Sequence, residues 1–348
     1  MRDNPELAGK PIAVGGLPDK RGVVATCNYE ARKFGIRSAM AAATARRKCP
    51  DLIIIRPDMD KYREASRSIH SIFRRYTDLI EPLSLDEAYL DVSNCELHQG
   101  SATIIAQSIR DAVRSEVGIT ISAGIAPNKF LAKVASDWNK PDGQFVVTPA
   151  QVDEFVAGLP VRKLHGVGKV TAQKMQRLGI ETCADLRTLN QEQLLKYFGS
   201  FGERLHQLSM GTDNRPVTVE RVRKSVSVEN TFVTDLPDLP SCLEQLPSLQ
   251  LQLAKRLERI GDDLQIHKQF IKIKFSDFVQ TTVEMLSGHT VPENFIEMCK
   301  QGFARGNRPV RLLGMGVRLA ATDQAVKPVL DEEQIPLRLD ILSNESAT

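Results

Sequence analysis

The chain has 348 residues, of which 42% are hydrophobic and 26% are charged, and its formal net charge is +3. This composition is ordinary for a globular protein, and the length predicts roughly two to four domains. The six cysteines are widely spaced and form no Cys-x-x-Cys pair, which argues against a zinc site and against a disulfide framework. No stretch approaches the ~20 apolar residues of a membrane span. We therefore expect a reduced, cytoplasmic protein with no membrane partner.

The first 160 residues alternate between strand-like and helix-like segments. Apolar runs predict strands at residues 11–16, 21–28, 51–56 and 118–126, and two short strands that meet near residues 83–87. The helical spacing of apolar side chains predicts helices over residues 30–49, 58–79, 101–116 and 128–139. Such an alternation is typical of an α/β or α+β sheet domain.

The remainder of the chain divides into four parts. Residues 151–213 are helical with short loops, and residues 214–224 form a basic linker. The last domain, 225–322, is predicted to contain a strand, a helix, two strands, a helix and a final strand. The acidic, proline-interrupted tail, 323–348, is predicted to be flexible.

Adjacent carboxylates interrupt the strand-like run PLSLDEAYLDV at Asp86 and Glu87. Burying two unpaired like charges is costly, so either the chain bends there or a cation lies near them. At a bend, both carboxylates can reach one edge of the sheet and hold Mg²⁺ together with phosphate oxygens. This pattern favours two-metal phosphoryl transfer, and the alternative is an ordinary acidic hairpin tip.

Two other segments contain residues that could grip a polyphosphate. In ATCNYEARKFGIRS, Tyr29 and Arg32 are three residues apart and share a helical face, with Thr26 just before them. Lys140 follows a predicted helix in DWNKPDG. The alternatives are a plain surface helix for the first segment and a helix-capping cation for Lys140.

Glycine turns and basic strands suggest contact with a nucleic-acid backbone. A glycine turn before a helix presents N–H groups to phosphate, and the two such turns supply Gly166, Gly168, Lys169, Thr171, Gly199 and Gly202. Alternating lysines or arginines give a strand one basic face, and these are Arg221, Arg223, Lys272 and Lys274. Two turns and several basic strands favour sequence-independent, salt-dependent binding over plain loops and a solvated face.

Six segments resemble the Y-family DNA polymerases, in particular the bacterial DNA polymerase IV group. They are NYEARKFGIRSAM, EPLSLDEAYLDV, SAGIAPNKFLAKVASDWNKPDGQ, LHGVGKVTAQKMQRLGI, FGSFGERL and RKSVSVENTF, in family order over nearly the whole chain. The resemblance implies a palm (1–20 and 55–150), fingers (21–54), a helix-hairpin-helix thumb (151–213) and a little finger (225–322). It also implies a monomeric enzyme that performs low-fidelity, template-directed DNA synthesis past damaged bases.

The resemblance also implies roles for individual residues. Asp86 would be a metal ligand and Glu87 an essential neighbouring carboxylate, with two Mg²⁺ ions as cofactors. Thr26, Tyr29, Arg32 and Lys140 would contact the incoming deoxynucleoside triphosphate. The glycine turns would hold the primer-template duplex, and the basic sheet of the little finger would lie in its major groove.

One departure from the family pattern concerns the start of the chain. Family members begin with a strand of the type h-h-D-h-D-x-F-(F/Y), and this sequence opens just after that point. The first metal-binding aspartate would then be absent, and Asp3 does not replace it. We therefore expect the chain as written to be nearly inactive, through either an internal start codon or a natural truncation. The alternative function is a non-catalytic protein that binds DNA and the sliding clamp.

The tail contains a short peptide, QIPLRLD, that resembles the clamp-docking motif Q-h-x-L-x-L of bacterial polymerases. An extended peptide with a few apolar anchors is a suitable recognition element on a flexible tail. The resemblance implies binding to the sliding clamp (its beta subunit) through Gln334, Leu337 and Leu339.

Overall fold

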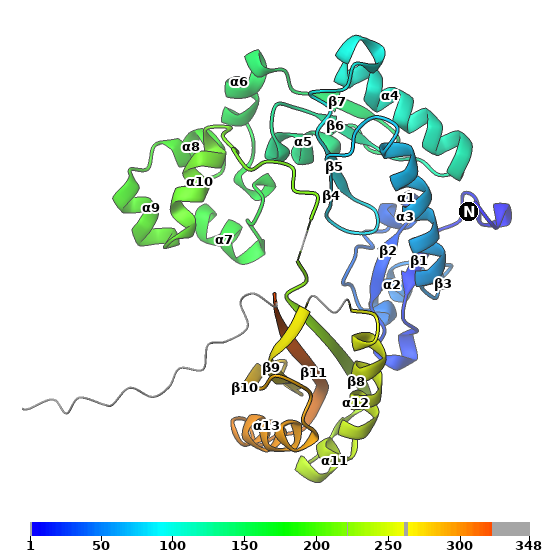
Figure 1. Ribbon diagram of the computed structural model, residues 1–348, viewed down its shortest axis with the longest axis vertical. Coiled ribbons are helices and arrows are strands. Elements are labelled where there is room, and N and C mark those ends of the chain that lie inside the picture. Colours follow the sequence, from blue (N-terminus) through cyan, green and yellow to red (C-terminus); the bar gives the residue numbers. More distant parts are fainter. Residues whose placement is uncertain (1, 221, 261–263, 322–348) are drawn as a thin grey trace, which may run out of the picture. The chain divides into compact units, whose positions relative to one another are not determined.

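The computed structural model describes residues 2–220, 222–260 and 264–321 (Figure 1). The chain divides into two compact units. The first comprises residues 2–16, 24–40 and 44–220, and the second comprises residues 222–321 with two short segments, 17–23 and 41–43. Both units combine helices with β-sheet, which agrees with the predicted multi-domain α+β class. Among the described residues, no helix is both long and apolar enough to cross a bilayer.

The first unit begins with a three-stranded sheet in the order β2-β1-β3. Its strands are β1 (Ile12–Gly15), β2 (Val24–Cys27) and β3 (Ile53–Ile55), and β1 runs antiparallel to β2 and parallel to β3. The predicted boundary between palm and fingers, at residue 20, therefore falls between the paired strands β1 and β2. Ala13, Val24 and Leu52 are buried in the small core of this sheet.

The single helix predicted over residues 30–49 is wrong. Two short helices occur instead, α1 (Tyr29–Lys33) and α2 (Ala42–Lys48). The segment between them contains two residues in the left-handed region, Gly35 at φ +74° and Ala39 at φ +65°. A right-handed helix cannot continue through that conformation, so the chain turns there.

Two amphipathic helices, α3 (Met59–Phe73) and α4 (Ala102–Ala112), form the next layer of the first unit. Each helix has an N-cap side chain, Asp58 for α3 and Ser101 for α4, that accepts a backbone N–H of the first turn. Their apolar faces meet in one cluster that includes the buried side chains Ile72, Ile105, Ile109 and Val113.

Helix α5 (Lys129–Ser136) lies among two short strand pairs. One pair is the antiparallel hairpin β4 (Ile80–Pro82) and β5 (Ala88–Leu90), and the other is the parallel pair β6 (Ala123–Ile125) and β7 (Gln144–Val146). The approach of α5 to β6 is so close that a Cβ on Gly124 would lie 2.0 Å from the Ala132 carbonyl oxygen. Only glycine fits at this position.

The helical segment after residue 150 shares its core with α5. Its helices are α6 (Val152–Ala157), α7 (Lys169–Arg177), α8 (Cys183–Arg187), α9 (Gln191–Phe198) and α10 (Phe201–Ser209). Phe130, Leu131 and Val134 of α5 belong to the same buried cluster as Leu186 and Leu205. Helix α5 therefore packs both on the strands β6 and β7 and on the helices of the predicted thumb.

A buried carboxylate links α5 to the end of this helical segment. The Asp213 side chain is fully buried, and it accepts hydrogen bonds from Arg204 (2.9 Å), from Arg215 (2.8 Å) and from the Phe130 backbone N–H (3.1 Å). Burial opposes ionisation of Asp213, but the hydrogen bonds from Arg215 and Arg204 outweigh it and hold its pKa well below the usual range. The ionised carboxylate therefore stabilises the fold.

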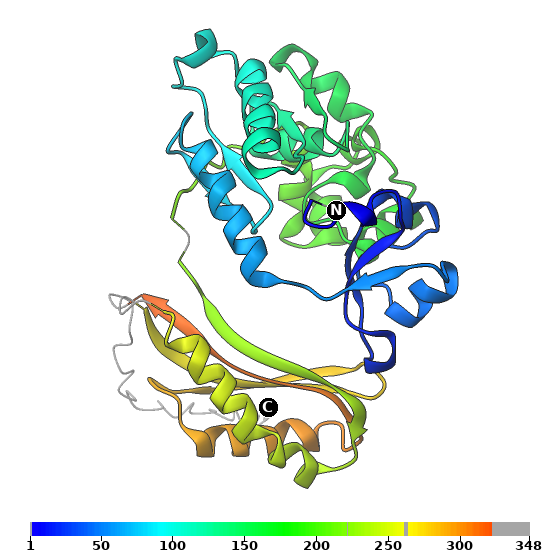
Figure 2. The same cartoon turned by 90° about the vertical axis from the view of Figure 1, so that its right-hand side faces the viewer.

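The second unit is a four-stranded antiparallel sheet in the order β10-β9-β11-β8. Its strands are β8 (Ser225–Leu236), β9 (Leu264–Phe275), β10 (Gln280–Leu286) and β11 (Val310–Ala321). One face is covered by α11 (Leu239–Glu244), α12 (Leu246–Leu257) and α13 (Pro292–Ala304) (Figure 2). The element order is the predicted one, except that the single helix predicted between the first two strands is divided into α11 and α12. Pro247 lies in the first turn of α12, where proline is tolerated.

We predict that Asp213→Asn makes the first unit less stable and less sensitive to acid. The substitution leaves Arg204 and Arg215 without their carboxylate, at a cost of about 2–3 kcal/mol at pH 7, because both arginines are partly exposed. Since the pKa of Asp213 is depressed on folding, its stabilisation is present above pH ~4 and is lost as the pH falls below that value. Urea unfolding at pH 7 and pH 3, followed by fluorescence of the single tryptophan, Trp138, measures both effects.

The matched control is Asp60→Asn, which removes a carboxylate that is 97% exposed and paired with Arg63 on α3. This control should leave both stability and acid sensitivity close to those of the parent. Equal acid sensitivity in the parent and in Asp213→Asn would contradict the role given to the Asp213 carboxylate.

Candidate active site

The two adjacent carboxylates lie in a tight turn between β4 and β5. The backbone N–H groups of Leu83 and Ser84 donate to the Glu87 carbonyl oxygen at 2.9 Å and 3.3 Å, which closes the turn. Asp86 and Glu87 are both exposed. The sequence offered an exposed bend or a neighbouring cation as explanations for these charges, and the bend is confirmed.

A cation is also present beside the turn. Lys133 of α5 places its Nζ 2.5 Å from Oε1 of Glu87, and Ser84 donates its hydroxyl to Oδ1 of Asp86 at 2.6 Å. Lys133 was not among the predicted site residues. It lies four residues after Lys129 on the predicted helix, so the two lysines share one face, but only the fold shows which acid each one reaches.

The donor set at this turn suits one hard divalent cation. Mg²⁺ is usually bound by one or two carboxylates, with the remaining ligands supplied by water and substrate phosphates, and Asp86 and Glu87 fit that requirement. Within residues 2–220, 222–260 and 264–321, no group of three or more His, Cys, Asp and Glu side chains is arranged to hold a metal. A second ion would need ligands beyond these two side chains.

The first predicted phosphate-binding group lies on β2 and α1. Thr26 is exposed on β2, and Asn28 caps α1 by accepting the Ala31 N–H. The predicted shared face of Tyr29 and Arg32 is present, with the guanidinium carbon 5.8 Å from the ring centroid. Arg32 also donates to the Cys27 carbonyl oxygen at 3.3 Å, so its side chain is held at the start of this helix.

Lys140 lies in the loop that follows α5, three residues beyond the C-cap residue Asp137. Its Nζ forms an ion pair with Asp137 at 2.5 Å, and both side chains are more than 40% exposed. No hydrogen bond or ion pair among the described residues connects Lys140, the Tyr29–Arg32 pair and the Asp86–Glu87 turn to one another. A ligand would have to bridge them.

The first glycine turn has the predicted form. Gly166 has φ +91°, and an added Cβ there would lie 2.9 Å from the ring of Phe201. Gly168 is the N-cap of α7, and Lys169 is exposed beside it. The first backbone N–H groups of a helix have no partner within it, so this end of α7 presents donors and a lysine, with Thr171 in the same first turn.

The second turn differs in the placement of its glycines. Gly199 has φ +58° and ends α9, which requires glycine there. Gly202 is buried in α10, where an added Cβ would lie 2.5 Å from the Leu194 carbonyl oxygen, and its N–H donates to the Gly199 carbonyl oxygen. Gly202 is therefore explained by the close packing of α9 against α10 rather than by an exposed N–H group.

The uncovered face of the four-stranded sheet carries both signs of charge. Lys272 and Lys274 lie on this face, but Lys272 is paired with Glu229 at 2.7 Å, and Glu284 pairs with Arg318 at 2.8 Å. The lysine and arginine pattern predicted a basic face, but the acids Glu229 and Glu284 on the neighbouring strands also lie there. Arg223 is exposed just before β8, whereas Arg221, Gln334, Leu337 and Leu339 lie outside the described residues.

Three sequence families match parts of the chain. Residues 1–137 match the impB/mucB/samB family, residues 223–327 match the C-terminal domain of the impB/mucB/samB family, and residues 162–213 match a family described as DNA polymerase-iota, thumb domain. The first match covers the elements from β1 to α5, and the second covers the four-stranded sheet with its helices. The third covers both glycine turns.

Known proteins resemble the chain over most of its length. A DNA polymerase IV of Pseudomonas syringae pv. tomato is 60% identical over 92% of this chain and 90% of its own. One from Pseudomonas aeruginosa is 62% identical over 92% of this chain and 91% of its own.

Solved structures agree in fold. A Y-family DNA polymerase chimera, Dbh-Dpo4(243-245)-Dbh, has a TM-score of 0.82 and 27% identity over 90% of this chain and 93% of its own. The insertion ternary complex of Dbh DNA polymerase has a TM-score of 0.64 and 26% identity over 91% of this chain and 94% of its own. The predicted fold class and family are confirmed, and the chain belongs to the DNA polymerase IV group of the Y-family DNA polymerases, which are DNA-directed DNA polymerases.

Proposed function

We propose that this chain adds deoxynucleotides to a primer under the direction of a template, and that it does so on damaged as well as intact DNA. The observation that carries the proposal is the exposed Asp86–Glu87 turn beside Lys133, in a chain of this family. Such a turn leaves carboxylate oxygens available to a cation that also binds the phosphates of a nucleotide.

Different residues around the turn would bind Mg²⁺, balance its carboxylate ligands and contact the triphosphate. Asp86 and Glu87 would hold Mg²⁺, which, when bound, neutralises the charge that develops on the transferred phosphoryl group. Lys133 pairs with Glu87 and would balance its charge. Lys140 and Arg32 would pair with the triphosphate, while Tyr29 and Thr26 would pack against it and donate to it.

The DNA would be held by sequence-independent contacts. The N-terminus of α7, with Lys169 and Thr171, would offer backbone donors to one phosphate, and a second phosphate contact at the turn of Gly199 and Gly202 stays a prediction from the sequence. The uncovered face of β8–β11, with Lys272, Lys274 and Arg223, would follow the duplex backbone. One neighbour in fold is itself named as an insertion ternary complex of Dbh DNA polymerase.

Two parts of the proposal extend beyond the described contacts. A second Mg²⁺ ion stays a prediction from the family resemblance, because two carboxylates suit a single ion. Binding to the sliding clamp through Gln334, Leu337 and Leu339 also stays a prediction. Both are separable from DNA synthesis, so neither decides the test below.

We predict that the chain extends a primer in a template-dependent manner and that Asp86→Asn lowers the rate by roughly a hundredfold or more, because a ligand of the charge-neutralising ion is lost. The assay is single-turnover extension of a labelled primer with Mg²⁺ and one deoxynucleotide at a time, over long incubations, so that slow addition is detected. Asp91→Asn is the matched control, because Asp91 lies in the same sequence run and bonds the Ser93 N–H instead.

Three results would separate the functions. Correct-nucleotide addition by the parent and Asp91→Asn, with loss in Asp86→Asn, supports synthesis at this turn. Equal activity in Asp86→Asn would contradict the role of the turn. Tight DNA binding with no addition by any variant would favour the non-catalytic DNA-binding alternative.

We also predict that Glu229→Gln tightens the binding of primer-template DNA by roughly two- to fivefold at low salt, because it frees Lys272 and removes a charge that repels phosphate. The salt dependence should become steeper by about one phosphate contact. Fluorescence anisotropy of labelled DNA across a salt series measures both. Glu297→Gln is the control, since Glu297 lies on α13 over the opposite face, and equal tightening in both variants would show a net-charge effect only.

A further inference from the structure

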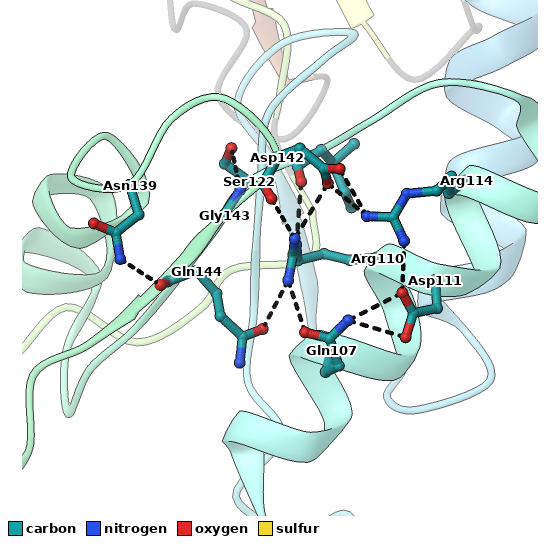
Figure 3. Close-up of polar contacts among 10 residues, drawn as sticks. Gln107, Arg110, Asp111, Arg114, Ser122, Asn139, Asp142, Gly143 and Gln144 are labelled. Atoms are coloured by element: carbon teal, nitrogen blue, oxygen red, sulfur yellow. Dashed lines mark hydrogen bonds and ion pairs between the residues drawn. The ribbon is translucent and has the colours of Figure 1, made fainter.

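Helix α4 carries a buried arginine. Arg110 is only 7% exposed, although arginine is rarely buried without paired charges. It belongs to none of the predicted sites. Its guanidinium is instead aimed at the loop between α5 and β7, residues 137–143, which carries Lys140 (Figure 3).

Nearly every donor of this guanidinium is used. Nη2 donates to both the carbonyl oxygen and Oδ1 of Asp142, the latter at 3.2 Å. Nε donates to the Ile121 carbonyl oxygen at 3.3 Å, and Nη1 donates to Gln107 at 2.8 Å and to Gln144 at 3.5 Å. Arg110 therefore joins α4 to both the Asp142 backbone and the start of β7.

A second arginine completes the attachment of Asp142. Arg114, one turn further along, donates to both carboxylate oxygens of Asp142 at 2.8 Å and 2.7 Å, and it is itself held by Asp111 at 2.7 Å. Gln107 bonds both Arg110 and Asp111, so the side chains of Gln107, Arg110, Asp111 and Arg114 form one network (Figure 3). The backbone of Asp142, at φ +49°, is thus fixed in the left-handed region.

The loop is also closed on itself. Asn139 donates to the Gln144 carbonyl oxygen at 2.9 Å, and the Ala123 N–H donates to the Gly143 carbonyl oxygen at 3.0 Å. An added Cβ on Gly143 would lie 2.0 Å from the Asn139 carbonyl oxygen, so only glycine permits this closure. Lys140 therefore lies between two fixed points, Asn139 and Asp142.

We propose that Arg110, through Asp142, is a positioning residue for Lys140. The inference rests on the proposed contact between Lys140 and the triphosphate. The ion pair of Lys140 with Asp137 is exposed and contributes little to the placement of the lysine. The location of its ammonium group then depends on the backbone, and the buried attachment of that backbone to α4 is the contact between Arg110 and the Asp142 carbonyl oxygen.

The test is a double-mutant cycle on nucleotide binding, which needs no turnover. The variants are Arg110→Met, Lys140→Met and both together, each saturated with a primer-template whose primer ends in a dideoxynucleotide. Isothermal titration calorimetry then measures the Kd of the next correct deoxynucleotide in Mg²⁺. Fluorescence anisotropy measures the Kd for DNA, and thermal unfolding measures stability.

Two further variants control for a general loss of structure. Arg187→Met removes another partly buried arginine, which donates to the Ser209 carbonyl oxygen and pairs with Asp153. Neither partner belongs to the loop that carries Lys140. Asp142→Asn keeps the carbonyl contact, suits the left-handed backbone and weakens only the charged pairing. It serves as the informative variant if Arg110→Met does not fold.

Arg110→Met and Lys140→Met should each weaken nucleotide binding by about tenfold, and the double variant should bind no more than about twofold more weakly than Lys140→Met. Asp142→Asn should weaken it less, and Arg187→Met should leave it unchanged. Parental affinity in folded Arg110→Met or Asp142→Asn, or fully multiplicative effects in the double variant, would overturn the inference. Parental affinity in Lys140→Met would instead refute the proposed triphosphate contact.

Discussion

The arrangement of the first unit depends on the ion pair between Lys129 and Glu81 at the start of α5. The two charged atoms are 2.6 Å apart, and the side chains are only 9% and 19% exposed. Lys129 also donates to the Pro216 carbonyl oxygen at 2.7 Å, and Glu81 accepts the Thr218 N–H at 2.8 Å. Because a poorly solvated charge must keep its partners, this pair holds together the helix, the carboxylate hairpin and the segment that follows the thumb.

The same hairpin contains a structural acid, Glu81, and acids that are available to a ligand, Asp86 and Glu87. Burial opposes ionisation of Glu81, but hydrogen bonds from Lys129 and the Thr218 N–H outweigh it and hold its pKa below the usual value. Glu81 is thereby committed to the fold. Glu87, six residues later, is 42% exposed and has one lysine partner from the next turn of α5. Helix α5 thus contacts the hairpin at Glu81 through Lys129 and at Glu87 through Lys133, and the loop after the helix carries Lys140.

Local patterns in the sequence were sufficient where the structure is local. The bend at Asp86–Glu87, the pairing of Tyr29 with Arg32 and the element order of the second unit all follow from short-range spacing and turn chemistry. The prediction of a single helix over 30–49 was wrong because Gly35 and Ala39 adopt the left-handed conformation within a run of good helix formers. Lys133, Arg110 and Glu229 were missed because their roles depend on partners 46, 32 and 43 residues away, which periodicity cannot reveal.

The central claim is that Lys129 ties three separate segments together, and hydrogen–deuterium exchange of Lys129→Met tests it most directly. Methionine nearly keeps the length of the side chain but leaves the Glu81 carboxylate without its cationic partner. We expect the amides of the hairpin, 80–90, and of residues 213–218 to exchange faster together, while exchange in the sheet β8–β11 is unchanged. Faster exchange confined to the first turn of α5 would contradict it, because the hairpin and the segment after the thumb would then be held independently of Lys129.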